Sequence, residues 1–442
     1  MEFERDEVSN QHSKRSTRTK RAQSPSNSAS NRHPKGRKRT KRAQFPSNSI
    51  QDSNLTIPAL PPELITEILS RLPVKSLLKF RSVSKSWVAI ISSPEFIKTH
   101  LSLSANKNKE DTHHMLILGL SGPKWKFKDC PLSSLFCDSV VNEAFDLVYP
   151  IKNASKDISI VGSCNGLILL AHYSEYSLLW NPAIRKCKKL PDLRPRLKKN
   201  NYAVYGFGHD EFHDDYKVMG VFNNYGGSDY VEVKMYSLKS DSWTSVDYCG
   251  EILNASGSSQ KMKLNNSGLF VNGKLHWDTI TSGPVVRTGK NIISFDLANE
   301  KWEKLEKPSG VGKNELCVGM LGSDLSIFCD YEETYLGAWV MKEYGVKESW
   351  VKMFTIEYPK GQYLYPPFFM SSKGEILVVF GSTFMIYSSK DHSVRYTYVT
   401  NSGDCSLNEI YIESLVCPFS TEGRENATKE REKLRSKQSS NK

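Results

Sequence analysis

The densest group of metal-ligand-type side chains lies between His209 and Asp215, where the sequence reads HDEFHDD. Imidazole and carboxylate groups at such close spacing could bind a metal ion. The segment also falls between two strand-like patterns, where Asp and His are ordinary turn residues. Because histidine spacing alone is a weak signal for a metal, we expect a turn here and predict no metal and no cofactor.

Cys164 is the second candidate for chemistry, because Gly162-Ser163-Cys164-Asn165-Gly166 resembles a turn that presents a nucleophile. A nucleophilic thiol needs a base within reach and donors for an oxyanion, and no base can be assigned from the sequence. Asn-Gly is a strong hairpin turn, so we expect Cys164 to pack as a small apolar residue. The chain has no phosphate-binding loop, no HExxH and no paired-cysteine RING pattern. We therefore predict no catalytic activity.

The positive charge of the chain is concentrated at its ends. The net charge of +12 first suggests a nucleic-acid partner. However, residues 1–54 hold 13 Lys and Arg against 5 Asp and Glu, and residues 420–442 hold 7 against 4, so residues 55–419 are nearly neutral. The basic runs Lys14–Arg21 and Arg32–Arg42 could bind nucleic acid, anionic lipid or a nuclear-import receptor, or they could be a solvated leader. No aromatic residues interleave with them, so we do not expect a specific nucleic-acid role.

Composition divides the chain into four parts. Residues 1–54 and 420–442 are polar and have few apolar anchors, and we predict that both are disordered. Residues 55–104 have a helical pattern and residues 105–419 a strand pattern. The N-terminus is acidic and polar and therefore no secretory signal, and no apolar run is long enough for a membrane span. Nine cysteines without a CxxC pair suit a reducing compartment, so we expect a nuclear or cytoplasmic location, or both, and no membrane partner.

The helical spacing of apolar residues predicts three short amphipathic helices between residues 60 and 100. The first covers Pro62 to Leu72, the second covers Ser76 to Val83, and the third contains Trp87. Ser93 followed by Pro94 then has the pattern of a new N-cap with proline at the first helical position. Three helices over so short a stretch cannot bury an independent core, so their apolar surface needs a partner.

From about Met115 onward, short β-rich runs of period two are separated by Gly, Asn, Asp and Ser turns, and a unit repeats every 45–60 residues or so. Tyr236–Trp243 and Phe295–Trp302 share a spacing of seven residues, and Trp339–Trp350 and Tyr387–Tyr396 look like stretched versions. The repeat length suits a four-stranded propeller blade. The pattern predicts a mainly β fold with a small α module, in which a β-propeller-like domain of about six blades follows the helices. A two-sheet sandwich would alternate in the same way but would not explain the repeat.

The stretch from Leu60 to Trp87 reads LPPELITEILSRLPVKSLLKFRSVSKSW and closely resembles the F-box of the large plant F-box families. Ser82 and Ser84 stand where that family often has cysteine. The pieces GSCNGLILL, LWNPAIRKCKKLP, YGFGHDEFHDDYKVM, LFVNGKLHW and FDLANEKWEKL resemble the kelch-like F-box-associated domain that follows such F-boxes. Together the two resemblances cover roughly residues 55–418.

The resemblance implies a non-catalytic substrate-recognition adaptor of a Skp–cullin–F-box ubiquitin ligase. The F-box would bind the Skp subunit, which bridges to a cullin, and the β domain would bind a target protein for ubiquitination. Alternatively, the helices only pack against the β domain, or the chain is a propeller-type module that binds glycans or nucleic acid without a ligase role. The candidates for packing on the Skp subunit or for fixing the helices are Leu60, Pro61, Leu64, Ile68, Leu72, Pro73, Leu77, Leu78 and Trp87.

The sequence does not identify the target or the residues that bind it. Specific interfaces depend on a few aromatic or Arg anchors, and rigid scaffolds display such anchors on their connections. We therefore expect the target to bind one face of the β domain. The connections that we single out are Leu193–Tyr205, Asn223–Tyr230, Tyr248–Lys263 and Tyr358–Pro367.

Overall fold

The structure is a computed structural model of the chain, and it describes most residues between Leu60 and Phe419. The described ranges are 60–105, 114–120, 126–137, 142–148, 158–172, 176–192, 201–224, 231–248, 262–264, 267–281, 291–311, 315–331, 334–358, 368–380, 383–402 and 405–419. The disorder predicted for residues 1–54 and 420–442 lies outside these ranges, as do most of the four connections singled out for the target. No helix in the described ranges is long and apolar enough to cross a membrane.

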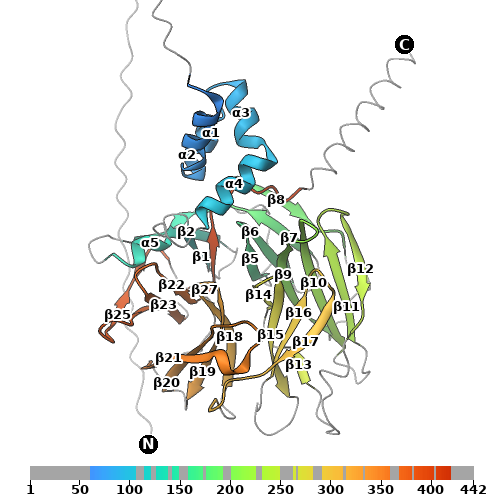
Figure 1. Cartoon of the computed structure of the whole chain (residues 1–442), viewed down its shortest axis with the longest axis vertical. Helices are drawn as coiled ribbons and strands as arrows, with labels where there is room; N and C mark the ends of the chain where they lie inside the picture. The colour runs from blue at the N-terminus through green and yellow to red at the C-terminus, as the bar shows by residue number, and fades with distance from the viewer. Residues whose placement is uncertain are drawn as a thin grey trace, which may run out of the picture. The chain divides into compact units, whose positions relative to one another are not determined.

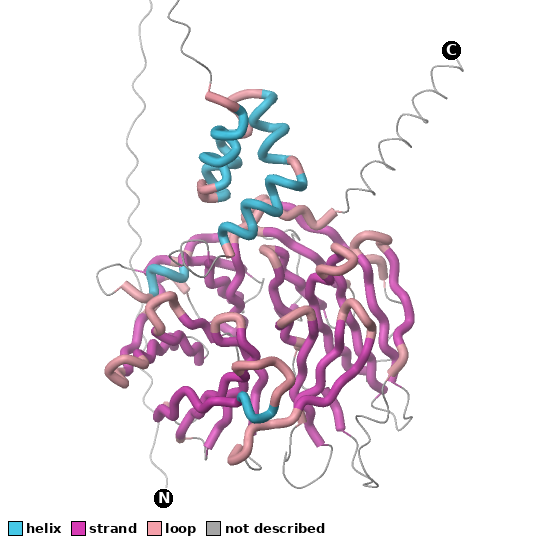
Figure 2. The backbone as a smooth tube through the Cα atoms, in the orientation of Figure 1, coloured by secondary structure: helices cyan, strands magenta, loops and turns pink. Residues whose placement is uncertain are grey.

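Four short helices, α1 to α4, form the helical module at the start of the described chain and are drawn in cyan in Figure 2. Proline and serine determine where the helices begin. Pro61 and Pro73 are the N-cap residues of the first two helices, and the side chains of Ser84 and Ser93 accept the backbone N–H of Trp87 and Phe96 at 3.1 and 3.2 Å. The helices are α1 (Pro62–Ser70), α2 (Val74–Phe80), α3 (Lys85–Ser92) and α4 (Pro94–Ser104).

The predicted helix boundaries need three corrections. The first helix ends at Ser70 rather than Leu72, and the second runs from Val74 to Phe80 rather than from Ser76 to Val83. The differences at Leu72 and Ser76 centre on Pro73, because a proline disfavours helical geometry in the residue before it and fits the start of the next helix. The N-cap predicted at Ser93 is confirmed, and it opens a fourth helix.

Six sheets of antiparallel strands follow the helices, as the sequence predicted (Figure 1). We call them blades 1 to 6. Each of blades 2, 3, 5 and 6 uses four consecutive strands, blade 4 uses five, and blade 1 takes one strand from the end of the chain. A parallel pair of two-residue strands and two short helical turns, α5 (Leu132–Leu135) and η1 (Lys347–Ser349), lie outside the blades.

Blade 1 consists of β27 (Cys405–Ile412), β1 (His114–Leu120), β2 (Lys126–Pro131) and β4 (Phe145–Asp146). Blade 2 consists of β5 (Ile158–Cys164), β6 (Leu167–His172), β7 (Ser177–Asn181) and β8 (Lys186–Lys189). Blade 3 consists of β9 (Asn201–Asp210), β10 (Asp215–Asn224), β11 (Val231–Ser237) and β12 (Ser242–Val246).

Blade 4 consists of β13 (Met262–Leu264), β14 (Leu269–Val271), β15 (Lys274–Thr281), β16 (Ile292–Asp296) and β17 (Lys301–Leu305). Blade 5 consists of β18 (Glu315–Leu321), β19 (Asp324–Tyr331), β20 (Tyr335–Met341) and β21 (Trp350–Glu357). Blade 6 consists of β22 (Phe368–Met370), β23 (Glu375–Phe380), β24 (Thr383–Ser388) and β25 (Val394–Thr397). The parallel pair outside the blades is β3 (Asn142–Glu143) with β26 (Val399–Thr400).

The blades close into a ring, which distinguishes a propeller from a sandwich. The final strand β27 pairs with β1, so the two ends of the β region share blade 1. The apolar side chains form a separate core between each blade and the next, including one between blade 6 and blade 1. A two-sheet sandwich would have one shared core instead. The fold is therefore a six-bladed β-propeller preceded by helices.

The hairpin turns repeat from blade to blade with the same backbone geometry. In blades 2 and 4, the first turn is Asn-Gly with both residues in the left-handed region, at φ 52° and 81° for Asn165 and Gly166. The turn between the last two strands of blades 2, 3, 4 and 6 has one non-glycine residue in the left-handed region. This residue comes five positions after an aromatic residue on the strand before the turn. These residues are Arg185, Asp241, Glu300 and His392.

A tryptophan on the last strand of three blades joins that blade to the previous one. Its indole N–H donates to a backbone carbonyl just beyond the outer strand of the previous blade. We call this arrangement the indole clamp. The three bonds are Trp243 Nε1 to Pro191 O at 2.9 Å, Trp302 Nε1 to Asp247 O at 3.1 Å and Trp350 Nε1 to Glu306 O at 2.9 Å.

Two of the predicted repeat units are different in the structure. Trp350 lies opposite Met341 rather than Trp339, whose partner is Lys352. In blade 6, Tyr387 lies opposite Val394, seven residues later, so this unit is not stretched to Tyr396. Blade 6 therefore has the regular spacing but no indole clamp.

Glu409 on β27 is a carboxyl group whose pKa burial raises to about 7, from 4.5. Ser163 on β5 donates a hydrogen bond to its Oε1 at 3.1 Å. Because the pKa of Glu409 is higher in the folded state than in the unfolded state, the neutral carboxyl group favours the fold. Its contribution to the free energy of unfolding is fully present below about pH 4.5 and is lost as the pH rises through 7. We expect the free energy of unfolding to show this loss in the wild type and not in Glu409→Gln, by urea denaturation at about pH 4 and about pH 8. An equal loss in the variant would contradict the assignment to Glu409.

Candidate functional site

The outer face of α1 carries an exposed apolar stripe. Leu60, Leu64 and Ile68 follow one another at intervals of four residues, which places them along one side of the helix and the residues just before it. Their exposed fractions are 54%, 51% and 52%, while Leu69 on the opposite side is only 1% exposed. Val83, just after α2, is a further exposed apolar side chain, at 59%. In the described residues these four side chains face solvent, so an unfilled apolar surface remains on the helical module.

The inner side of the helical module forms a small core that is not made by the helices alone. Leu69, Val74, Leu77, Ile91 and Phe96 are buried together. The same cluster contains a residue from the segment after β27, at the far end of the chain, and two partly buried residues of the β7–β8 turn. These three residues are Leu415, Ala183 and Ile184. The propeller thus completes the core of the helices, as expected for a module too small to fold on its own.

The helices are also tied to the propeller by α4 and by ion pairs. Ile97 and Leu101 on α4 pack against the core between blades 2 and 3. Lys98 Nζ lies 2.7 Å from the Asp214 carboxylate, and hydrogen bonding to this ammonium group lowers the pKa of Asp214. The pair is exposed, so it orients more than it stabilises. The inner face of the module is therefore occupied by the propeller, and the stripe on α1 is left outside that contact.

The nine predicted residues of this region fall into two groups. Leu77 is fully buried, and Leu72, Leu78 and Trp87 are partly buried, so these four serve the packing of the helices; Trp87 meets the ring of Phe80 edge to face with ring centroids 5.5 Å apart. Sequence reasoning did not separate the two groups and did not select Val83, whose apolar character just after a predicted helix was the available signal. The predicted residues that are exposed are Leu60, Pro61, Leu64, Ile68 and Pro73.

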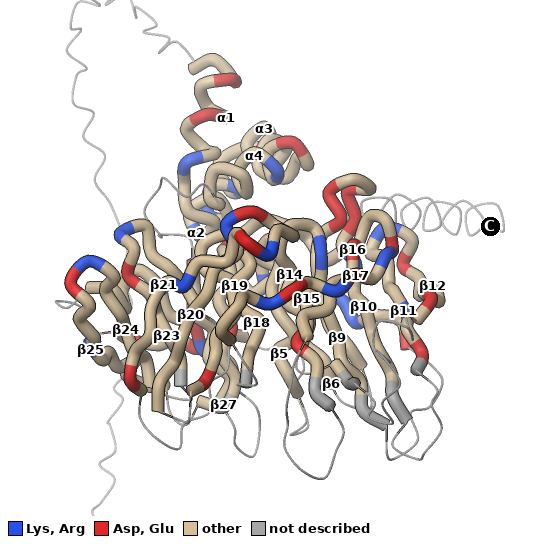
Figure 3. The backbone as a smooth tube through the Cα atoms, turned by 60° about the horizontal axis from the view of Figure 1, so that its bottom comes forward, with Lys and Arg blue, Asp and Glu red and all other residues tan. Residues whose placement is uncertain are grey.

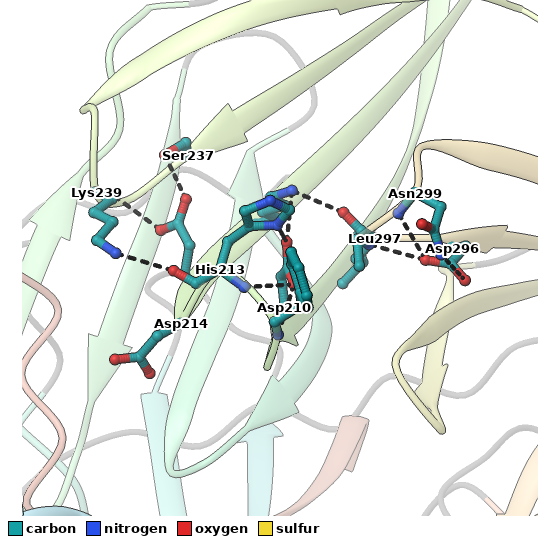
Figure 4. A network of polar contacts seen from close by, with 12 residues as sticks. Asp210, His213, Asp214, Ser237, Lys239, Asp296, Leu297 and Asn299 are labelled. Atoms are coloured by element: carbon teal, nitrogen blue, oxygen red, sulfur yellow. Dashed lines mark hydrogen bonds and ion pairs between the residues drawn. The ribbon is translucent and has the colours of Figure 1, made fainter.

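The segment from His209 to Asp215 includes the β9–β10 turn, and Asp210 and His213 form hydrogen bonds within it. The Asp210 carboxylate accepts the backbone N–H groups of Phe212 and His213, the His213 ring at 2.6 Å and the Lys217 ammonium at 2.8 Å (Figure 4). Lys217 also donates to Leu297 O in blade 4 at 2.7 Å. Among the described residues, no group of three or more His, Cys, Asp or Glu is placed to hold a metal ion.

Cys164 is buried at the end of β5 and packs in the core between blades 2 and 3. Burial raises the pKa of its thiol to about 12. A thiol with such a pKa is protonated at neutral pH and is a poor nucleophile. The structure therefore confirms the core role predicted for this cysteine.

Lys and Arg alternate with Asp and Glu along the strands and turns in the view of Figure 3. No face dominated by one sign appears on the described residues in that view. This distribution agrees with the near neutrality of residues 55–419 in the sequence. It gives no support to an extended nucleic-acid interface, which would need a basic face.

Comparison with known proteins gives the same two parts. Residues 127–418 match the F-box associated beta propeller domain, and residues 57–99 match the F-box domain. The chain belongs to the plant F-box proteins with an associated propeller. It is 28% identical over 379 residues to F-box protein CPR1 of Arabidopsis thaliana, covering 81% of this chain and 88% of that protein. It is 29% identical over 366 residues to F-box/kelch-repeat protein At3g23880 of the same species, covering 81% and 96%.

The match of the F-box domain covers α1, α2, α3 and the first part of α4. It ends at residue 99, inside α4, whose inner face packs on the propeller. In this F-box protein α4 is therefore the connection between the F-box and the associated domain. The exposed stripe on α1 lies within the matched F-box region.

Proposed function

We propose that this F-box protein is the substrate-recognition subunit of a Skp–cullin–F-box ubiquitin ligase and has no catalytic activity of its own. The F-box binds the Skp subunit, which bridges to a cullin, and the propeller binds the target protein. The nine cysteines of the sequence, without a CxxC pair, suit a reducing compartment, so we place this activity in the nucleus, the cytoplasm or both.

The observation that carries the proposal is the apolar stripe of Leu60, Leu64 and Ile68 on the F-box. Each of these side chains is about half exposed although the F-box also buries a core that the propeller completes. Contiguous exposed apolar side chains mark interaction sites. A helix of the Skp subunit laid on this stripe would bury it and would leave the propeller accessible.

An adaptor must hold two partners at once, and the two parts of this chain meet that requirement. The F-box contacts the propeller through α4 and through the core that the two parts share, not through the stripe. The hydrophobic contact of Ile97 and Leu101 and the ion pair of Lys98 with Asp214 limit the movement of one part against the other. A target bound to the propeller would thus be held in a restricted orientation toward the ligase.

Binding of the purified full-length chain to a purified plant Skp subunit tests the proposal. We expect a complex of one chain with one Skp subunit, with micromolar or tighter affinity by isothermal titration calorimetry. The heat-capacity change should be negative, because apolar surface is buried. The absence of a complex with a correctly folded chain, as judged by cooperative unfolding, would refute the proposed function.

A further inference from the structure

Val394 occupies the position at which other blades carry the indole clamp. Trp243 lies opposite Tyr236, and Trp302 lies opposite Phe295, in the last two strands of blades 3 and 4. Val394 lies opposite Tyr387 in the same two strands of blade 6. The turn between the two partners has its left-handed residue at the same place in all three blades. The strand register and the turn therefore make the three positions equivalent. Blade 2 has the same register and turn with Cys187 opposite Trp180, so blades 2 and 6 are the two of these four blades that have a small side chain there.

A groove of about 810 Å³ lies at this position, between blade 5 and blade 6. One side is formed by the end of β21, from Thr355 to Tyr358, which corresponds to the part of a previous blade that receives an indole elsewhere. The other side is formed by Tyr387, His392, Val394 and Tyr396. The groove thus lies where an indole clamp fills the junction between other blades.

The walls of the groove are aromatic and its rim is exposed. Tyr358 and Tyr387 are buried beneath it, at 4% and 3% exposure, while Val394 and Tyr396 are 40% and 45% exposed. Three further large hydrophobic side chains of this part of the propeller face solvent. They are Tyr335 and Val351 in blade 5 and Tyr398 just after β25. Tyr335 lies opposite Glu357 of the groove, and Tyr398 follows Tyr396 by two residues, so exposed aromatic side chains flank the groove on both blades, which is typical of an interaction site.

The charge of the groove favours a ligand that has a basic residue beside the group that enters the groove. Glu357 is exposed and is the only Asp, Glu, Lys or Arg among the described residues that line the groove. The His392 ring is hydrogen-bonded to the Tyr387 hydroxyl at 2.8 Å. A carboxylate on an aromatic wall attracts cations, and tyrosine faces add to this attraction.

We propose that the groove between blades 5 and 6 binds a tryptophan side chain of the target protein, presented on an extended segment with a basic residue beside it. The proposal rests on the proposed function, because it names a docking site for the target. The fold itself shows which group fits: in blades 3 and 4 an indole packs on the aromatic ring opposite it, with ring centroids 5.3 and 4.9 Å apart, and donates its N–H to a backbone carbonyl. Tryptophan is also among the residues that most often dominate an interface.

Binding of short peptides to the full-length chain tests the groove directly. The probe is acetyl-Gly-Trp-Lys-Gly-amide with a fluorinated indole, observed by fluorine NMR. The matched probes replace the tryptophan with fluorinated phenylalanine or the lysine with glutamate. We expect the Trp-Lys peptide to bind at least ~10-fold more tightly than the phenylalanine peptide and several-fold more tightly than the Trp-Glu peptide. Glu357→Gln should abolish the difference between the Trp-Lys and Trp-Glu peptides.

Val394→Trp supplies the missing clamp from within the chain. We expect this variant to lose detectable peptide binding and to unfold at a temperature a few degrees higher than the wild type, whereas the matched control Val394→Ile should keep both properties near the wild-type values. Tyr396→Ser, on the exposed rim, should weaken peptide binding at least ~10-fold without a loss of folding. Tyr396→Ser still tests the groove if the bulky side chain of Val394→Trp disturbs blade 6.

Several results would overturn the proposal: no binding of the Trp-Lys peptide, equal binding of the phenylalanine peptide, or full binding to Val394→Trp. An additional measurement separates this failure from a failure of the proposed function. Skp binding by Val394→Trp should equal that of the wild type, since the groove and the α1 stripe belong to different parts of the chain. Skp binding without peptide binding would refute the groove alone, and peptide binding without Skp binding would refute the ligase role alone.

Discussion

Replacing Leu64 and Ile68 together with aspartate is expected to abolish binding of the Skp subunit to this F-box protein. Both side chains are about half exposed on α1, so the free chain can accommodate aspartate at these positions. In the complex, two unpaired carboxylates would have to be buried, which costs several kcal/mol. We expect the affinity to fall by a factor of about 100 or more, measured by calorimetry with the purified Skp subunit.

Two other variants show whether the effect is specific to the stripe. Phe145→Asp changes an equally exposed apolar residue in blade 1 and should leave Skp binding unchanged. Leu77→Asp places the charge in the core of the helices, where Leu77 is fully buried, and should unfold the F-box as well. Retention of Skp binding by the Leu64 and Ile68 double variant would show that the stripe is not the contact surface.

Replacing Lys217 with methionine is expected to destabilise the propeller by about 3–5 kcal/mol. The ammonium group is bonded to the Asp210 carboxylate in its own blade and to Leu297 O in the next, and both side chains are nearly inaccessible to water. Burial raises the pKa of Asp210, but the hydrogen bonds from Lys217 and His213 lower it by more. Without Lys217 this buried carboxylate loses its cation, which is the costly outcome for half of a buried pair. Urea denaturation of the full-length variant measures the effect.

A double-mutant cycle identifies the source of this loss. Adding Asp210→Asn to Lys217→Met removes the unpaired charge and keeps an oxygen that can accept the backbone N–H groups of the turn, so much of the lost stability should return. Lys239→Met is the matched control, because this lysine donates to His213 O from an exposed position in the same region. We expect it to change the free energy of unfolding by less than about 0.5 kcal/mol. A single-variant effect as small as that of the control would contradict the structural role of the pair.

The sequence predicted the parts of this protein that depend on local pattern. The F-box helices follow from apolar spacing and from the prolines and serines at their starts, and the blades follow from the seven-residue spacing of Tyr236 to Trp243 and Phe295 to Trp302. The spacing in blade 6 was read incorrectly as Tyr387 to Tyr396, because a search for aromatic pairs passes over a valine. The missing clamp at Val394 therefore became visible only through the strand register.

Contacts between segments that are far apart in the chain could not be predicted from the sequence. The pairing of β27 with β1 and the place of Leu415 in the F-box core depend on bringing the last described residues to the first. Local patterns carry no information about such pairings. The same limit explains why the predicted F-box residues were not divided into exposed and buried groups: Leu64 and Leu77 are alike in type, and only the packing of α1 to α4 separates them.

Affinity purification of the tagged chain from plant cells with the proteasome inhibited tests the proposed ligase role in the cell. We expect a Skp subunit and a cullin to co-purify with the wild type and both to be lost from the Leu64→Asp, Ile68→Asp double variant, while Phe145→Asp retains them. Wild-type chain recovered in folded form without either subunit would contradict the assignment of this F-box protein to a ubiquitin ligase.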